Sequence, residues 1–163
     1  MADLELTRTA DDRRLYTLGD IGTMRLTGFW SRSATAQAGG RTWELARSGF
    51  WRVVARATDE GGVVVGEFEP RGGLRRGGTL RWSDREYLLR PSSSWRERYA
   101  LLADDRELTV LDGKGWGKRP VAVTVHDLAL VEPGLLLFAT FVVRGLAEDA
   151  SSSSSAGVVA ATG

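Results

Sequence analysis

The sequence contains few side chains that could carry out catalysis. His126 is its only histidine and it has no cysteine, so a Ser-His-Asp triad or a metal site would depend on this one residue. Asp127 follows it directly and would point to the opposite face of a strand. Asp104 and Asp105 form a pair typical of hairpin turns rather than of acid–base catalysis. We therefore predict no catalytic residue, no metal site and no cofactor, and we expect that the protein is not an enzyme.

The strongest candidate for ligand binding is the glycine-rich segment 113–119. Its glycines would expose backbone N–H groups, and cations and an indole stand between them, a combination that can hold a phosphate or a lipid headgroup. The candidate side chains are Lys114, Trp116, Lys118 and Arg119. The segment is not a nucleotide-binding P-loop, because Asp112 replaces the first glycine and Arg119 replaces the serine or threonine. The alternative is a long hairpin turn whose tryptophan folds back on a sheet.

A second basic segment, residues 71–78, adds Arg71, Arg75 and Arg76 to the candidate binding residues. Arginine–glycine repeats are typical of RNA-binding tails, but two copies are too few, and a loop between strands fits better. Nucleic acid is therefore not the expected partner. Residues 71–119 carry 12 Lys or Arg and 7 Asp or Glu. A basic face would form if both segments left the sheet at the same end.

The composition predicts one domain with a substantial core. The chain has 163 residues, 42% of them apolar, and a net charge of +1, which gives no global field that would attract nucleic acid or a membrane. The acidic N-terminus lacks the apolar stretch of a signal peptide, and the absence of cysteine fits an intracellular protein. We expect a cytoplasmic protein that lies at the membrane surface if it binds headgroups.

One apolar stretch near the C-terminus must organise the fold. On a helix, the large side chains between Pro133 and Leu146 point in every direction, and a helix that is apolar all round must be buried all round. A membrane-spanning helix needs about 20 apolar residues. The uncharged run from Pro133 to Val143 has only 11, so we predict no transmembrane span.

The rest of the chain alternates apolar and polar residues between glycine-rich turns, as in Met24-Arg25-Leu26-Thr27. We therefore predict a mainly β fold, a single antiparallel β-barrel of about 9–12 strands that encloses the helix. Residues 1–14 are expected to form a flexible N-terminal arm, with an edge strand as the alternative. The barrel is expected over 15–149 with its helix at about 133–147, and 150–163 to be a disordered serine and alanine tail.

A weak internal similarity also occurs at a spacing of 44 residues. Five positions of one segment match a later segment in residue character: Trp43, Leu45, Trp51, Arg52 and Val64 fall on Tyr87, Leu89, Trp95, Arg96 and Leu108. Either a duplicated β-meander or chance explains these matches.

Asp-x-Gly hairpins, as in Asp20-Ile21-Gly22 and Asp59-Glu60-Gly61, precede the single apolar helix. In this layout the chain resembles the tubby C-terminal-like superfamily, which includes the LURP-one-related and phospholipid scramblase-like proteins. The resemblance covers residues 15–147. It implies a closed antiparallel barrel of about twelve strands around a central hydrophobic helix, and lipid binding as a function.

These observations favour a non-enzymatic binding or scaffold domain that recognises anionic lipid headgroups or phosphate groups through its basic glycine-rich loops. Two alternatives remain open at this point: a carrier for a small apolar ligand in a barrel lumen, and an enzyme of unknown class. A helix that fills the lumen would leave no room for such a ligand.

Overall fold

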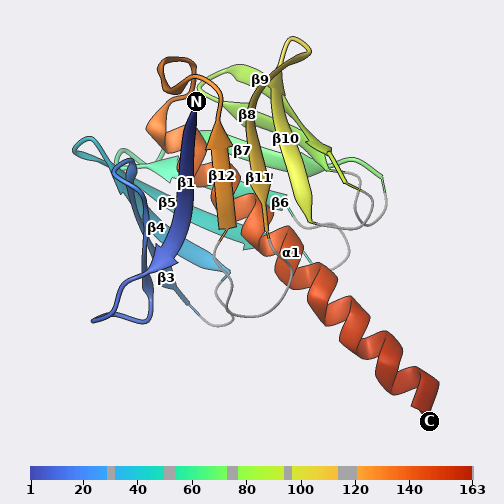
Figure 1. Ribbon diagram of the computed structural model, residues 1–163. Coiled ribbons are helices and arrows are strands. Elements are labelled where there is room, and N and C mark those ends of the chain that lie inside the picture. The colour runs from blue at the N-terminus through green and yellow to red at the C-terminus, as the bar shows by residue number, and fades with distance from the viewer. Residues whose placement is uncertain (29–31, 50–53, 73–76, 94–96, 114–120, 163) are drawn as a thin grey trace.

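The computed structural model is a closed antiparallel barrel of twelve strands with one C-terminal helix, α1 (Figure 1). It describes residues 1–28, 32–49, 54–72, 77–93, 97–113 and 121–162, with residues 151–162 described as backbone only. The strands are β1 (Ala2–Arg8), β2 (Leu15–Leu18), β3 (Gly22–Thr27), β4 (Ser33–Ala38), β5 (Arg41–Ser48), β6 (Val54–Asp59), β7 (Val64–Pro70), β8 (Gly78–Trp82), β9 (Arg85–Pro91), β10 (Arg98–Ala103), β11 (Arg106–Asp112) and β12 (Val121–Val125). The predicted barrel is confirmed.

Each strand pairs with its neighbours in the chain, and β1 pairs with β12 to close the barrel. The prediction of a flexible arm over residues 1–14 is therefore wrong for β1. Leu6 is buried and Leu4 packs against the core, and the charged side chains of Asp3 and Glu5, which alternate with them, face outward. Because of these charges the sequence of β1 does not by itself indicate a strand. Its partner, Val121–Val125, is more than a hundred residues away in the sequence.

The helix α1 (Pro133–Thr162) runs through the barrel, where every side chain from Leu135 to Val143 is at most 2% exposed. It packs against β3, β4, β5, β7, β10, β11 and β12, so strands surround it. On β4 the inward residues Ala34, Ala36 and Ala38 are small enough to let it approach. The one buried polar group in this stretch, Thr140, donates a 2.7 Å hydrogen bond to the Leu136 carbonyl. The expectation of an enclosed helix is confirmed.

Beyond the barrel the helix continues to Thr162 and projects away from the strands (Figure 1). The predicted end near residue 147 and the predicted disordered tail over 150–163 therefore differ from the structure. Extending a helix that has already formed adds one hydrogen bond per residue fixed, and alanine is the best helix former. The serine- and alanine-rich tail could not nucleate a helix by itself, but it can extend α1, which has already formed.

Because neighbouring strands run antiparallel, successive connections lie alternately at the two opposite ends of the barrel. We call one the loop end. It has the connections that run from each odd-numbered strand to the next even-numbered strand: residues 9–14, 28–32, 49–53, 71–77, 92–97 and 113–120. We call the other the turn end, with the short connections 19–21, 39–40, 60–63, 83–84 and 104–105 and the segment 126–132 that leads into α1. The helix thus enters at the turn end and leaves at the loop end.

The spacing of 44 residues recurs in the strand boundaries. It places Arg41, the start of β5, on Arg85, the start of β9, and places Val54, the start of β6, on Arg98, the start of β10. Trp43 and Tyr87, which match under the same shift, are both buried. The similarity therefore has a structural counterpart in two successive strands.

Candidate functional site at the loop end

The two basic segments singled out in the sequence are joined to strands at the same end of the barrel. Residues 71–77 connect β7 to β8 and residues 113–120 connect β11 to β12, and both pairs of strand ends belong to the loop end. Arg71 is exposed, and its backbone N–H donates a 3.0 Å hydrogen bond to the Gly77 carbonyl. The other predicted binding residues lie outside the described residues: Arg75, Arg76, Lys114, Trp116, Lys118 and Arg119.

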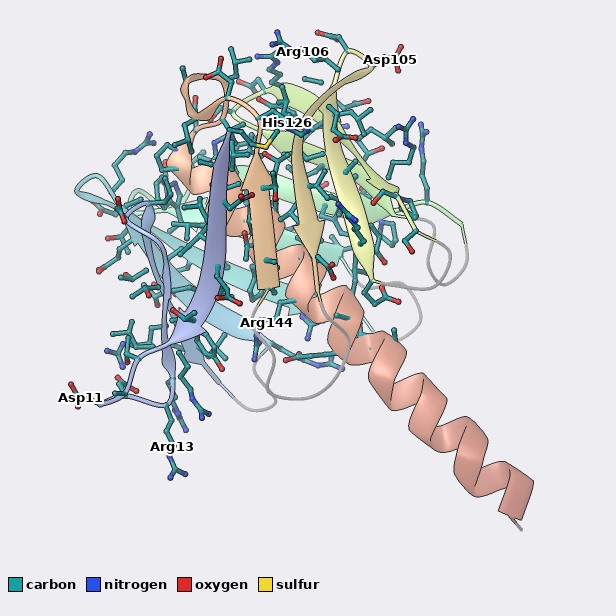
Figure 2. The ribbon with its side chains drawn as sticks, viewed as in Figure 1. Asp11, Arg13, Asp105, Arg106, His126 and Arg144 are labelled. Carbon is teal, nitrogen blue, oxygen red and sulfur yellow. The ribbon has the colours of Figure 1, made fainter. Side chains whose placement is uncertain are left out.

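The side chains considered for catalysis lie at the turn end, where Figure 2 labels Asp105, Arg106 and His126. His126 Nε2 lies 2.8 Å from Glu107 Oε1, with the two side chains 35% and 40% exposed. Asp127 accepts a hydrogen bond from the Ala129 backbone N–H and so caps the short 3-10 helix Leu128–Leu130. These contacts hold the connection between β12 and α1 in place. Within the described ranges, no three histidine or carboxylate side chains gather as a metal-binding group.

Asp104 and Asp105 form a tight turn with φ angles of 48° and 64°. Both residues have the left-handed backbone conformation that a two-residue hairpin requires and that aspartate tolerates better than most residues. The pair therefore has the turn role that its sequence predicted.

By sequence, the connections at the two ends of the barrel have opposite net charge. The connections at the loop end contain eleven basic residues and three acidic ones: Arg13, Arg14, Arg32, Arg52, Arg71, Arg75, Arg76, Arg96, Lys114, Lys118 and Arg119, against Asp11, Asp12 and Glu97. The connections at the turn end contain seven acidic residues and no lysine or arginine: Asp20, Glu60, Asp84, Asp104, Asp105, Asp127 and Glu132. When the terminal residue of every strand is added and α1 is left out, the net charge is about +9 at the loop end and about −5 at the turn end.

The aromatic residues are divided in a related way. Those in strands or in α1 are buried, except for the partly buried Tyr16: Trp43, Phe68, Trp82, Tyr87, Tyr99, Phe138 and Phe141. All the others belong to loop-end connections and lie outside the described residues: Phe29, Trp30, Phe50, Trp51, Trp95 and Trp116. The tripeptide Gly-Phe-Trp occurs in two of these connections, at residues 28–30 and 49–51. The sequence therefore assigns its remaining aromatic side chains to the same end as its excess of cations.

Two of the three acidic residues in the loop-end connections are engaged in contacts. Asp12 forms an ion pair with Arg25 and accepts a 2.9 Å hydrogen bond from the Arg14 backbone N–H (Figure 2 labels its neighbours Asp11 and Arg13). This backbone hydrogen bond, and then Arg25, hold the pKa of Asp12 below its ordinary value. Glu97 accepts a 2.8 Å hydrogen bond from the Tyr99 hydroxyl. Asp12 and Glu97 are therefore held in place by neighbouring groups.

Comparison with protein family models, curated proteins and solved structures finds no match to this chain. The chemistry of its two ends is therefore the basis for assigning a function. Lys and Arg near an anionic membrane surface gain about 1 kcal/mol each, and tryptophan favours the headgroup region. A barrel with this polarity would turn its loop end toward an anionic surface and its turn end away.

Arg13, Arg14, Arg32, Arg52 and Arg96 are candidates that sequence reasoning missed. The signal that could have found them is the alternation of the strands, since every second connection of an up-and-down barrel belongs to the same end. The doubled Gly-Phe-Trp tripeptide was a further signal. The described part of the chain has no helix long and apolar enough to cross a membrane.

Proposed function

We propose that the protein is a non-enzymatic binding domain that recognises the phosphate groups of anionic lipids through its loop end. The observation that carries the proposal is the separation of charge along the barrel axis, with about +8 in the loop-end connections and about −7 in the turn-end connections. Because anionic lipids are concentrated in the cytoplasmic leaflet, we propose that the domain works at the cytoplasmic surface of a membrane.

The charge at the loop end is large enough to matter. Surface potential falls off within about 8 Å at physiological ionic strength, so only cations near the membrane contribute. If half of the eleven contribute about 1 kcal/mol each, the gain of about 5 kcal/mol corresponds to more than a thousandfold increase in membrane partitioning. Repulsion of the acidic turn end would add a preferred orientation.

Membership of the tubby C-terminal-like superfamily is part of the proposal. It is supported by a closed twelve-strand barrel around a hydrophobic helix near the C-terminus, the arrangement that the resemblance implies. The proposed lipid binding is the function that this kinship would imply.

The two alternatives receive less support. A carrier needs a hollow lumen, and the fully buried stretch of α1 from Leu135 to Val143 occupies the interior where a ligand would sit. An enzyme would be favoured by a pocket lined by ionised side chains deep in the sheet. In the described chain the fully buried polar residues are Thr109 and Thr140, and the inward-pointing arginine, Arg47, is paired with Glu148 and Asp149. Neither observation favours a second function.

Vesicle co-sedimentation tests the proposal. We expect retention on phosphatidylcholine vesicles that contain phosphatidylserine or a phosphoinositide, with loss of retention in high salt and none on phosphatidylcholine alone. Inositol hexakisphosphate and inorganic phosphate, added as competitors, distinguish recognition of a phosphate group from attraction to the surface as a whole.

A matched pair of variants locates the binding end. Replacing Arg13, Arg32 and Arg71, all exposed at the loop end, by glutamine should weaken partitioning by about a hundredfold. The control replaces three exposed arginines of the turn end, Arg41, Arg85 and Arg106, and should have little effect although its net charge changes equally. No retention on either anionic vesicle at low salt, equal loss in both variants, or tighter binding to a single-stranded oligonucleotide would overturn the proposal.

A further inference from the structure

A pair of arginines holds one carboxylate where α1 leaves the barrel at the loop end. Arg47 Nη2 lies 3.4 Å from Glu148 Oε2, and Arg144 Nη1 lies 3.0 Å from Glu148 Oε1. Arg47 Nη1 also lies 3.4 Å from Asp149 Oδ2. The two oxygens of one carboxylate thus bridge two guanidinium groups, and both guanidinium groups lie within reach of a single small anion.

Arg47 is held in an unusual position for a charged side chain. It lies on the same face of β5 as the buried Trp43 and Leu45, so it points inward, and its side chain is only 7% exposed. Its Nε is buried and has no hydrogen-bond partner in the described part of the chain. Gly145 makes this possible, because a Cβ at that position would lie 2.2 Å from Arg47 Nη1.

Arg144 is also fixed in place, by contacts on α1 and β2. Its guanidinium lies over the ring of Tyr16, 5.2 Å from the ring centroid, and its side chain is 20% exposed. A cation held over an aromatic face loses little further freedom when it binds an anion. The two arginines therefore form a preorganised, partly desolvated cationic site.

Glu148 fits this site imperfectly. Burial raises the pKa of Glu148 above its ordinary value, and the opposing effects of Arg144 and Arg47 do not cancel this rise. The contacts of Arg47 with Glu148 and Asp149 are both long for charge-assisted hydrogen bonds. The side chain of Glu148 is 39% exposed, so solvent reaches the carboxylate where it contacts the two arginines.

We propose that Arg47 and Arg144 form a phosphate-binding site at the loop end, in which the carboxylate of Glu148 is a resident anion that a phosphate monoester displaces. The inference rests on the proposed function and names the part of the loop end that would bind the phosphate of the lipid headgroup. A phosphate monoester carries a charge of about −1.5 to −2 and three strong acceptor oxygens. It can therefore pair with both guanidinium groups and also accept from the Arg47 Nε that the carboxylates leave without a partner.

Titration of the folded protein with inositol 1,4,5-trisphosphate and with inorganic phosphate tests this site. Glu148→Gln removes the resident charge and should tighten trisphosphate binding by about tenfold. Arg144→Gln should weaken it by about tenfold or more. The control is Arg56→Gln, which removes an arginine from an exposed ion pair with Glu67 on the outside of the barrel and should leave binding unchanged. Arg47→Lys keeps the charge but not the planar fork, and it should weaken trisphosphate binding.

The outcomes distinguish this site from the proposed function. Weaker trisphosphate binding by Glu148→Gln, or no change with Arg144→Gln, would overturn the site. If vesicle retention persists in either case, the proposed function stands and the headgroup is read elsewhere on the loop end. If vesicle retention is also absent, the proposed function fails together with the site.

Discussion

The indole Nε1 of Trp82 donates a 2.9 Å hydrogen bond to the carboxylate of Glu132, the residue directly before α1. Trp82 also lies 5.8 Å, between ring centroids, from both Trp43 and Phe138. One contact therefore ties the start of the helix to the end of β8 and to the aromatic side chains that close the turn end.

Glu132→Ala should lower the free energy of unfolding by about 1–2 kcal/mol, because a partly buried indole N–H loses its charged acceptor. Chemical denaturation followed by tryptophan fluorescence measures the change. Glu60→Ala, which removes an exposed carboxylate from the same end, is the control and should change stability by less than about 0.5 kcal/mol. An equal effect of the two variants would show that the hydrogen bond contributes nothing.

Gly134→Ala should destabilise the protein by about 1–3 kcal/mol, because the added methyl would overpack the site where α1 begins. Its Cβ would lie 2.5 Å from Trp82 Cζ2 and 2.7 Å from Trp43 Cζ2, and these rings are buried. Gly61→Ala is a suitable control, since its Cβ would meet only an aspartate oxygen at 3.3 Å. A stabilising effect of Gly134→Ala would mean that helix propensity outweighs crowding and that the rings yield easily.

Leu136→Asp or Phe138→Asp should prevent folding, because either variant places an ionised group in an interior where the replaced side chain is fully buried. Far-ultraviolet circular dichroism and the solubility of the expressed protein report this outcome. Leu136→Ala is the milder companion and should cost about 2–5 kcal/mol while leaving the protein folded. A soluble aspartate variant that unfolds cooperatively would contradict the enclosed helix.

The raised pKa of Glu148 makes a prediction for the dependence of stability on pH. Burial disfavours its charged form in the folded protein, so its contribution to stability is greatest below the ordinary glutamate pKa and is lost as the pH rises through the folded-state pKa. Glu148→Gln should therefore be as stable as the original at pH 4 and slightly more stable at pH 7. The gain should be about 0.5 kcal/mol or less because solvent screens the exposed part of the side chain. Lower stability of the variant at pH 7 would show that its ion pairs outweigh its burial.

The sequence predicts the barrel and its enclosed helix because both depend on local pattern. Every large side chain between Leu135 and Val143 is apolar, and no arrangement except enclosure hides all of them. The strand β1 was predicted only as an edge-strand alternative to a flexible arm because Asp3 and Glu5 dominate its composition. Its pairing with Val121–Val125 depends on a distant part of the chain.

The candidate site was predicted only in part, for two physical reasons. A net charge of +1 averages over the chain and conceals the opposite charges of the two ends, which arise only when the strands alternate in direction. The contact between Arg47 and Glu148 joins residues 101 positions apart, so no spacing in the sequence indicates it. The residues at 71–76 and 114–119 were visible because their glycines and cations stand together in the chain.

The most direct test of the account asks which end of the barrel meets a membrane. Because the chain has no cysteine, Ser92→Cys at the loop end and Val63→Cys at the turn end each give a single labelling site on an exposed residue. With phosphatidylserine vesicles, an environment-sensitive fluorophore at position 92 should shift its emission to the blue and be quenched by spin-labelled lipid, while the same fluorophore at position 63 should not respond. Equal responses at the two positions, or no response at position 92, would contradict the account.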